Sequence, residues 1–419
     1  MEQATLHSPS TVDRSEQLAE SPTGAARIRI ILVLGALIAL GPLTIDMYLP
    51  ALPALGADLN ASESAVQLTL TGTLIGLGLG QLIIGPLSDS LGRRRPLIAG
   101  TIVHIAASLL CLIAPNVAVL GVLRTLQGVG AAATMVVAMA VVRDLFTGKA
   151  AATILSRLML VMGTAPILAP TIGAAVLSVG SWRGVFAVLA VLGAALLLVA
   201  IFLLKETLPV ERRRTGSFRP VLRTYRSLLT DPQFVVLTLV AALGMSALFS
   251  YVSGSSFVLQ DQFDLTQQQF ALVFALGAVA LIGASQVNVM LLNRFTAQQI
   301  VFGALAAGLV FGAVLIVFAE SGAGGLVGFL VPLLFLLAAV GFVLPNAPAL
   351  ALSRHGEAAG TAAALLGAAQ FGLGALIAPV VGLLGNDGPA MALTMTAGML
   401  VACAALAATM VRQRAVATA

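Results

Sequence analysis

Two charged residues lie inside long apolar segments, where a charge is expensive and normally serves a function. Asp46 lies in the segment 28–50 and Arg124 in the segment 118–142. On helices that rise 1.5 Å per residue, they lie about 6 Å and about 9 Å from the outer end of their segments. Burial favours the neutral carboxylic acid, and a nearby arginine favours the carboxylate. This pattern predicts a proton site, with Asp46 binding the proton and Arg124 controlling its proton affinity. A static ion pair that only fixes helix packing is the alternative.

A second group of charges occupies a very short connection between two apolar segments. Residues 85–96 read GPLSDSLGRRRP, so Asp89 and three arginines lie within one tight turn. Arginines concentrated in a short loop mark the cytoplasmic side of a membrane protein. Arg93 to Arg95 therefore serve as a topology marker.

These residues must be positioned by helices that cross a bilayer. Of the 419 residues, 59% are apolar and 9% are charged, against about 25% charged in soluble domains. The composition predicts an all-α membrane protein. Twelve segments have the length of about 20 residues that a ~30 Å hydrocarbon core requires: 28–50, 66–88, 96–114, 118–142, 153–179, 184–204, 233–257, 268–291, 298–319, 325–350, 357–384 and 389–411.

The basic residues set the orientation. With the N-terminus in the cytoplasm, Arg183 alone among the arginines and lysines falls in an external loop. Both termini are therefore predicted to be cytoplasmic, and the net charge of +5 is attributed to these loops rather than to a nucleic-acid partner. The expected parts are a disordered tail, six helices, a basic loop, six helices and a second tail: 1–27, 28–204, 205–232, 233–411 and 412–419.

The motifs resemble those of a known family. The run 85–96 is similar to the loop between helices 2 and 3 of the major facilitator superfamily, G-x-x-x-D-x-x-G-R-[RK]. Residues 43–53, LTIDMYLPALP, closely resemble the first-helix signature of twelve-span drug:proton antiporters, and among them of the Bcr/CflA family. Residues 124–132, RTLQGVGAA, look like their fourth-helix motif, which includes Gln127, Gly128 and Gly130. Residues 345–352 and 356–365 are similar to the tenth and eleventh spans of that family.

The resemblance implies two six-helix bundles that alternate access to a central site. It implies a monomer of the cell inner membrane that exports small hydrophobic drugs, bicyclomycin- or chloramphenicol-like, in exchange for protons. The proton gradient drives it, with no cofactor and no metal. The loop residues would form a latch that Asp89 closes in the outward-facing state by meeting a helix N-terminus and Arg143. The gating motif then comprises Gly85, Asp89, Gly92, Arg93, Arg94 and Arg143.

Two departures from the family pattern carry weight. The fifth-span element G-P-x-x-G-G is altered here, with Ala169 and Ala174 in place of two glycines; the matching residues are Gly163, Pro166, Pro170 and Gly173. In addition, apolar residues around Ile38 replace a second first-helix acid that some cation exporters carry. A single carboxylate predicts neutral or zwitterionic substrates rather than dications.

Other polar residues within spans are candidates for lining the substrate cavity, because a hydrogen-bonding group in hydrocarbon needs a partner. They are Tyr48, Ser246, Ser250, Tyr251, Asn346 and Gln370. His104 is expected to be a packing residue whose polar group is satisfied. The sequence contains neither a zincin nor a nucleophile-elbow motif and no phosphate loop, so it does not predict an enzyme or an ATP-driven pump. The remaining alternatives are a major facilitator importer of a small metabolite, and a sensor or scaffold that transports nothing.

Overall fold

The computed structural model describes residues 24–213, 219–355 and 358–417. Within this part of the chain every regular element is a helix. The predicted tail 1–27 lies largely outside the described residues, although Gly24 already begins the first helix. Residues 356–357, which belong to the eleventh-span resemblance, also lie outside them.

The first half of the chain forms six long helices and a short extension of the first. Their bounds are α1 (Gly24–Asp46), η2 (Leu49–Ala51), α2 (Leu52–Asp58), α3 (Glu63–Leu91), α4 (Arg94–Cys111), α5 (Val117–Leu145), α6 (Gly148–Leu177) and α7 (Trp182–Leu203). α1 ends at Asp46 because Pro50 has no N–H to donate to the Asp46 carbonyl, as a continued helix would require. The proline thus leaves Asp46 at a helix terminus.

The second half repeats this plan after a connection that contains η3 (Val210–Arg212) and α8 (Arg219–Leu229). Its elements are α9 (Pro232–Phe257), η4 (Val258–Gln262), α10 (Gln267–Leu291), α11 (Ala297–Ser321), α12 (Gly325–Leu352), α13 (Ala359–Ile377), α14 (Val380–Leu383) and α15 (Gly388–Ala417). The basic segment 205–232 therefore contains a helix, and α15 runs into the predicted tail 412–419.

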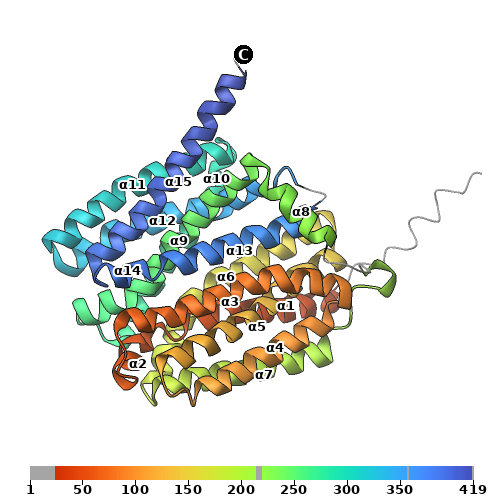
Figure 1. Cartoon of the computed structure of the whole chain (residues 1–419), viewed down its shortest axis with the longest axis horizontal. Coiled ribbons are helices and arrows are strands. Elements are labelled where there is room, and N and C mark those ends of the chain that lie inside the picture. The colour runs from red at the N-terminus through yellow and green to blue at the C-terminus, as the bar shows by residue number, and fades with distance from the viewer. Residues whose placement is uncertain (1–23, 214–218, 356–357, 418–419) are drawn as a thin grey trace, which may run out of the picture.

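The predicted all-helical membrane fold is confirmed. Eleven stretches of the described residues are long and apolar enough to cross a bilayer, and α4, which corresponds to the predicted span 96–114, packs beside them on α5 and α7. In Figure 1, α1 to α7 form one bundle and α9 to α15 the other. The bundles meet where α3 packs on α13 and α6 packs on α10.

Close helix contacts in the first bundle depend on glycines of the fourth-helix motif. A Cβ on Gly128 would overlap the Thr73 carbonyl of α3, and one on Gly130 would crowd the Gly100 carbonyl of α4. Small residues allow helix backbones to approach in this way. The motif therefore fixes α5 between α3 and α4, and Arg124 lies on the helix so fixed.

The bundle has two chemically different ends. We call the end where α3 finishes and α4 begins the basic end, because Arg93, Arg94 and Arg143 lie there. At the other end, which we call the opposite end, lie Asp58 and Glu63.

Candidate functional site

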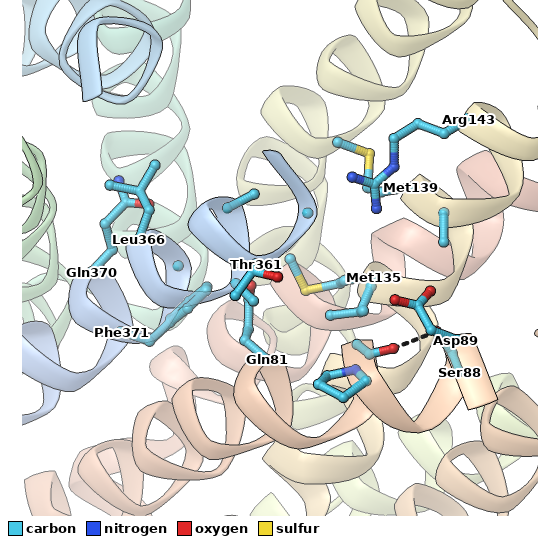
Figure 2. A pocket seen from close by; sticks show the side chains of 18 of the residues that line it. Gln81, Ser88, Asp89, Met135, Met139, Arg143, Thr361, Leu366, Gln370 and Phe371 are labelled. Carbon is cyan, nitrogen blue, oxygen red and sulfur yellow. Dashed lines mark hydrogen bonds between the residues drawn. The ribbon is translucent and has the colours of Figure 1, made fainter. Parts of the chain in front are cut away.

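A cavity of ≈ 440 Å³ lies between the two halves at the basic end. Figure 2 shows α13 on one side of it, with Thr361, Leu366, Gln370 and Phe371, facing side chains of α3 and α5 that include Gln81, Met135 and Arg143. Asp89 lies at the edge of the cavity with its side chain 37% exposed. The cavity is thus bordered by both bundles and reaches solvent at the basic end.

Methionines dominate the apolar wall of this cavity: Met135, Met139, Met159, Met162 and Met245. Unbranched methionines adapt to ligands of different shapes. The amides of Gln81 and Gln370 add neutral hydrogen-bonding groups, whereas the charged lining residues, Asp89, Arg93 and Arg143, lie at the basic end of the cavity. Such a wall suits a neutral, mainly apolar molecule.

Tyr225 of α8 adds a polar group that the sequence analysis missed. Its ring lines the cavity, and its hydroxyl is buried without a hydrogen-bond partner. Burial raises the pKa of Tyr225 above its ordinary value, so the hydroxyl remains a neutral donor. The signal in the sequence is weak, because Tyr225 lies in a polar connection rather than in a span.

Asp46 lies farther from the basic end than the cavity reaches. Its side chain is buried, with the residue 4% exposed, and it does not line the cavity, whereas Ile38 of the same helix does. The two are about 12 Å apart along the helix axis. Met135 packs against α1 at Gly41, between them. The segment that follows Asp46, η2, packs on α9 and α10, and Ser256 of α9 donates to the Leu49 carbonyl, so Asp46 lies near the second half.

Arg124 is completely buried on the other side of α1. Its guanidinium donates to the Gln127 Oε1 at 2.5 Å and to the Thr44 carbonyl at 3.0 Å. It also lies over the Tyr48 ring, 4.0 Å from the centroid. Thr44 lies two residues before Asp46, which is about 200° around α1, and Tyr48 lies in the turn that follows the helix. Arg124 therefore contacts α1 from the side away from Asp46.

The predicted pairing of Asp46 with Arg124 takes a different form in the structure. Both residues lie at similar depth, but the ion pairs of the described residues do not include one between them. Arg124 is held by neutral oxygens and an aromatic face instead. The contact that links the two residues is the backbone of α1, through the Thr44 carbonyl.

A polar network extends from Arg124 into α4. The Gln127 amide donates to the Ser108 hydroxyl at 2.7 Å, and Ser108 donates to the His104 carbonyl at 2.7 Å. The His104 Nε2 lies 2.9 Å from the Thr44 hydroxyl. His104 is therefore buried and hydrogen-bonded through Nε2, as expected for a satisfied packing residue, and it connects this network to Thr44. The Arg124 Nε and the His104 Nδ1 remain without partners in the structure.

The gating motif forms an ion-pair cluster inside the first half. Arg93 pairs with Asp89 at 2.5 Å and with Asp144 of α5 at 2.8 Å, and its side chain is only 8% exposed. Asp144 was not singled out from the sequence, although it directly follows Arg143. The Arg143 guanidinium lies near Gly360, at the start of α13 in the other half. The cluster places Asp89 and Arg143 at the cavity edge without joining the two halves.

Glu206 completes this cluster from the connection after α7. Its carboxylate accepts the backbone N–H groups of Arg93 at 2.8 Å and of Arg94 at 3.2 Å. Burial alone would raise the pKa of Glu206, but these N–H groups, that of Leu208 and the Arg213 charge outweigh it and lower the pKa. Gly92 has φ +88°, and a Cβ there would overlap Glu206. The motif needs a glycine here so that Glu206 can approach the start of α4.

The fifth-span element keeps α6 as one helix that contains both Pro166 and Pro170. A Cβ on Gly173 would overlap the Met47 carbonyl, next to Asp46 in sequence, and one on Gly163 would touch Ile282 of α10. Gly173 therefore lets α6 approach the end of α1 closely. The other motif glycine, Gly85, lies at the cavity wall.

Of the six predicted cavity residues, Gln370 lines the cavity. The others lie elsewhere in the interior. Ser246 and Ser250 donate to carbonyls of their own helix, and Asn346 pairs with Asn288 of α10 at 2.6 Å. Tyr251 stacks on Phe274 at 5.2 Å, and Tyr48 packs on Arg124. Their proposed contact with substrate stays a prediction.

At the opposite end, hydrogen bonds join the two halves. Ser64 donates to the Gly382 carbonyl at 3.0 Å, Gln67 to the Ser253 carbonyl at 3.3 Å, and Ser256 to the Leu49 carbonyl at 2.6 Å. Asn386 bonds to both Gln67 and Glu63. We call these residues the closure cluster. They hold the halves together at the end away from the cavity.

Two helical bundles that enclose a cavity, closed at one end of their interface, have the architecture of an alternating-access transporter. The model of the Major Facilitator Superfamily matches residues 34–379. The chain belongs to this superfamily, as the motif resemblance indicated. Its members are transporters, so the expectation that the chain is not an enzyme is confirmed.

Similar proteins agree with this assignment. The chain is 37% identical to the uncharacterized MFS-type transporter YdgK of Bacillus subtilis, over 87% of this chain and 90% of that protein. It is 31% identical to the bicyclomycin resistance protein homolog of Haemophilus influenzae, over 88% and 93% of the two chains. The solved nucleoside transporter NupG shares the fold, with a TM-score of 0.71, 12% identity and coverage of 91% and 99%.

Proposed function

We propose that the chain is a proton-coupled antiporter that exports small, hydrophobic, neutral drugs, bicyclomycin- or chloramphenicol-like, by alternating access. The observation that carries the proposal is the methionine-lined cavity of ≈ 440 Å³ between the halves, with the buried carboxylate of Asp46 just beyond it. A relative named for bicyclomycin resistance supports the drug class.

The basic end faces the cytoplasm of the cell in this proposal, because arginines concentrate on the inner side of membrane proteins. The cavity then opens inward, and the closure cluster shuts the outward side. Both termini lie in the cytoplasm, the membrane is the inner membrane, and the working unit is a monomer driven by the proton gradient without a cofactor.

Coupling follows from the position of Asp46. The carboxylate lies near α9 of the second half, so moving the halves changes its exposure to water and with it the affinity for a proton. Arg124 acts indirectly, because it holds the Thr44 carbonyl of α1 and orients the end of the helix that carries Asp46. Drug and proton exchange when each binds better to a different state.

Inside-out vesicles with an acidic interior test the coupling. Adding a neutral drug is expected to release protons through the wild-type protein, and Asp46→Asn is expected to lose this release while keeping drug binding. Glu320→Gln changes an exposed carboxylate at the opposite end and serves as the matched control. Proton release that survives in Asp46→Asn would contradict the assignment of the proton site.

The second candidate is an importer of a small neutral metabolite. The amides of Gln81 and Gln370 and the Tyr225 hydroxyl favour it, since they offer hydrogen bonds that a purely apolar drug does not need. Intact cells distinguish the two functions. An exporter lowers the amount of drug that cells accumulate, whereas an importer raises accumulation of its substrate.

A further inference from the structure

A second cavity, of ≈ 400 Å³, lies in the second half, away from the interface between the halves. Four phenylalanines line it, Phe295, Phe311, Phe335 and Phe342, and Gln299 is the one polar side chain among its lining residues. Phe335 is 52% exposed and Phe295 is 51% exposed. The cavity is therefore an apolar groove on the outside of the bundle, where lipid surrounds the protein.

The groove arises from the packing of three helices. α10 and α11 both pack on α12, but they make far fewer contacts with each other. α11 presents small residues to the groove, Gly303, Ala304 and Ala307. A Cβ on Gly303 would meet no atom within 4 Å. The space is thus open for an occupant rather than filled by neighbouring side chains.

The length of the groove matches one half of a bilayer. It runs along α11 from Gln299, close to the basic end, to Phe311. At 1.5 Å per residue this stretch is about 18 Å long, comparable to half of a ~30 Å hydrocarbon core, which is about 15 Å. A groove of this depth accommodates one acyl chain of the leaflet at the basic end.

A positive charge lies beside the mouth of the groove. Arg294 is exposed in the turn between α10 and α11, immediately before Phe295. The sequence contains no acidic residue from 265 to 319, so no carboxylate of α10 or α11 beside the groove neutralises Arg294. The first N–H groups of α11 are partly satisfied by the capping box of Thr296 and Gln299, so the arginine is the principal attraction for a phosphate.

From these features we propose that the groove binds one acyl chain of an anionic phospholipid, whose headgroup phosphate pairs with Arg294. Basic pockets between membrane helices bind such headgroups, and here an apolar groove of matching depth continues from the basic mouth. The lipid site is separate from the cavity between the halves, and lipid binding there does not depend on which substrate the protein transports.

Tryptophan quenching by brominated lipid tests the site. The chain has a single tryptophan, Trp182. Phe311→Trp in a Trp182→Phe background therefore places the one fluorescent tryptophan at the end of the groove farthest from Arg294. The protein is reconstituted in phosphatidylcholine bilayers with a small fraction of brominated phosphatidylglycerol, or of brominated phosphatidylcholine with the same chains. We expect half-maximal quenching at an about fivefold lower fraction of phosphatidylglycerol, the factor for one arginine at an anionic membrane surface.

Two further variants separate the headgroup from the chain. Arg294→Gln, at an exposed position, is expected to remove the preference for phosphatidylglycerol and leave the quenching by phosphatidylcholine. Gly303→Leu fills the groove and is expected to reduce quenching by both lipids. Gly283→Leu is the matched control, since Gly283 is an exposed glycine of α10 with nothing within 4 Å and lies outside the groove.

Three results would overturn the proposal. Equal quenching by the two lipids would mean an ordinary lipid contact without headgroup recognition. A preference that persists in Arg294→Gln would remove the arginine from the site. Absence of quenching by either lipid would mean that another molecule covers the groove. If the purified protein then has twice the mass of the monomer, that molecule is a second copy of the chain.

Discussion

The two ends of the interface between the halves differ in how they use polar groups. At the opposite end, the closure cluster joins the halves mainly through neutral donors and backbone carbonyls. At the basic end, the charges of Arg93, Asp89 and Asp144 are paired within the first half, and a cavity separates the bundles. A neutral hydrogen bond contributes only about 0.5–1.5 kcal/mol. The closed end is therefore held by contacts that are weak enough to be exchanged during a transport cycle.

Fixing the closed end covalently should have the largest effect. Ser64→Cys with Gly382→Cys, in a background with Cys111→Ala and Cys403→Ala, puts two thiols where Ser64 Oγ lies 3.1 Å from a Cβ built on Gly382. This spacing is within reach of a disulfide. Oxidation is expected to abolish transport, because the opposite end can no longer open, and reduction is expected to restore it. Each single cysteine is the control, and full transport by the oxidised pair would contradict the role of the closure cluster.

Weakening the closed end should shift the balance of states instead. Asn386→Ala removes the hydrogen bonds to Gln67 and Glu63, which we expect to cost the closed state about 2 kcal/mol. The ratio of states open at the opposite end to states open at the basic end should rise by roughly 30-fold. Distances between spin labels in the two halves measure this ratio. Asn293→Ala, an exposed change at the basic end, should leave it unchanged; an unaltered ratio in Asn386→Ala would contradict the prediction.

Removing one charge at the basic end should have the smallest effect of the three changes. Glu206→Gln weakens the bonds to the Arg93 and Arg94 N–H groups and is expected to lower the free energy of unfolding by about 1 kcal/mol at pH 7. Because the fold lowers the pKa of Glu206, its stabilisation is present above the ordinary value of 4.5 and is lost as the pH falls through the lowered pKa.

Unfolding of the two proteins as a function of pH measures this difference, which should disappear in acid. Glu211→Gln, at an exposed position nearby in the sequence, is the matched control and should behave as wild type at every pH. A difference between wild type and Glu206→Gln that stays constant down to acid pH would show that the carboxylate charge is not what stabilises the start of α4.

The spans and the two halves could be predicted because hydrocarbon imposes its requirement locally. Each crossing must satisfy its own backbone and present an apolar surface, so a window of about 20 residues suffices. The close helix contacts at Gly128 and Gly130 could be predicted in the same way, because small residues are what allow two helix backbones to approach.

Rotation about the helix axis limited the prediction of the site. The depths of Asp46 and Arg124 in the membrane could be predicted from the sequence, but the side of α1 on which each residue lies could not. Arg124 contacts Thr44 and Tyr48 rather than Asp46. Glu206 was missed because it meets Arg93 across more than a hundred residues of sequence. The methionines of the cavity left a signal in the four-residue spacing of Met135 and Met139, which resembles ordinary packing on a helix.

One feature of the closure cluster affects how the protein tolerates change. Three of its bonds end on the backbone carbonyls of Leu49, Ser253 and Gly382, and every residue type carries a carbonyl. The donor side chains are therefore specified, whereas the acceptor positions constrain only the path of the chain. If all substitutions across this end were tested for transport, we expect that polar donors would be required at Ser64, Gln67 and Ser256. At the positions of their partners, we expect that any residue would be tolerated that fits the space and keeps the path of the backbone.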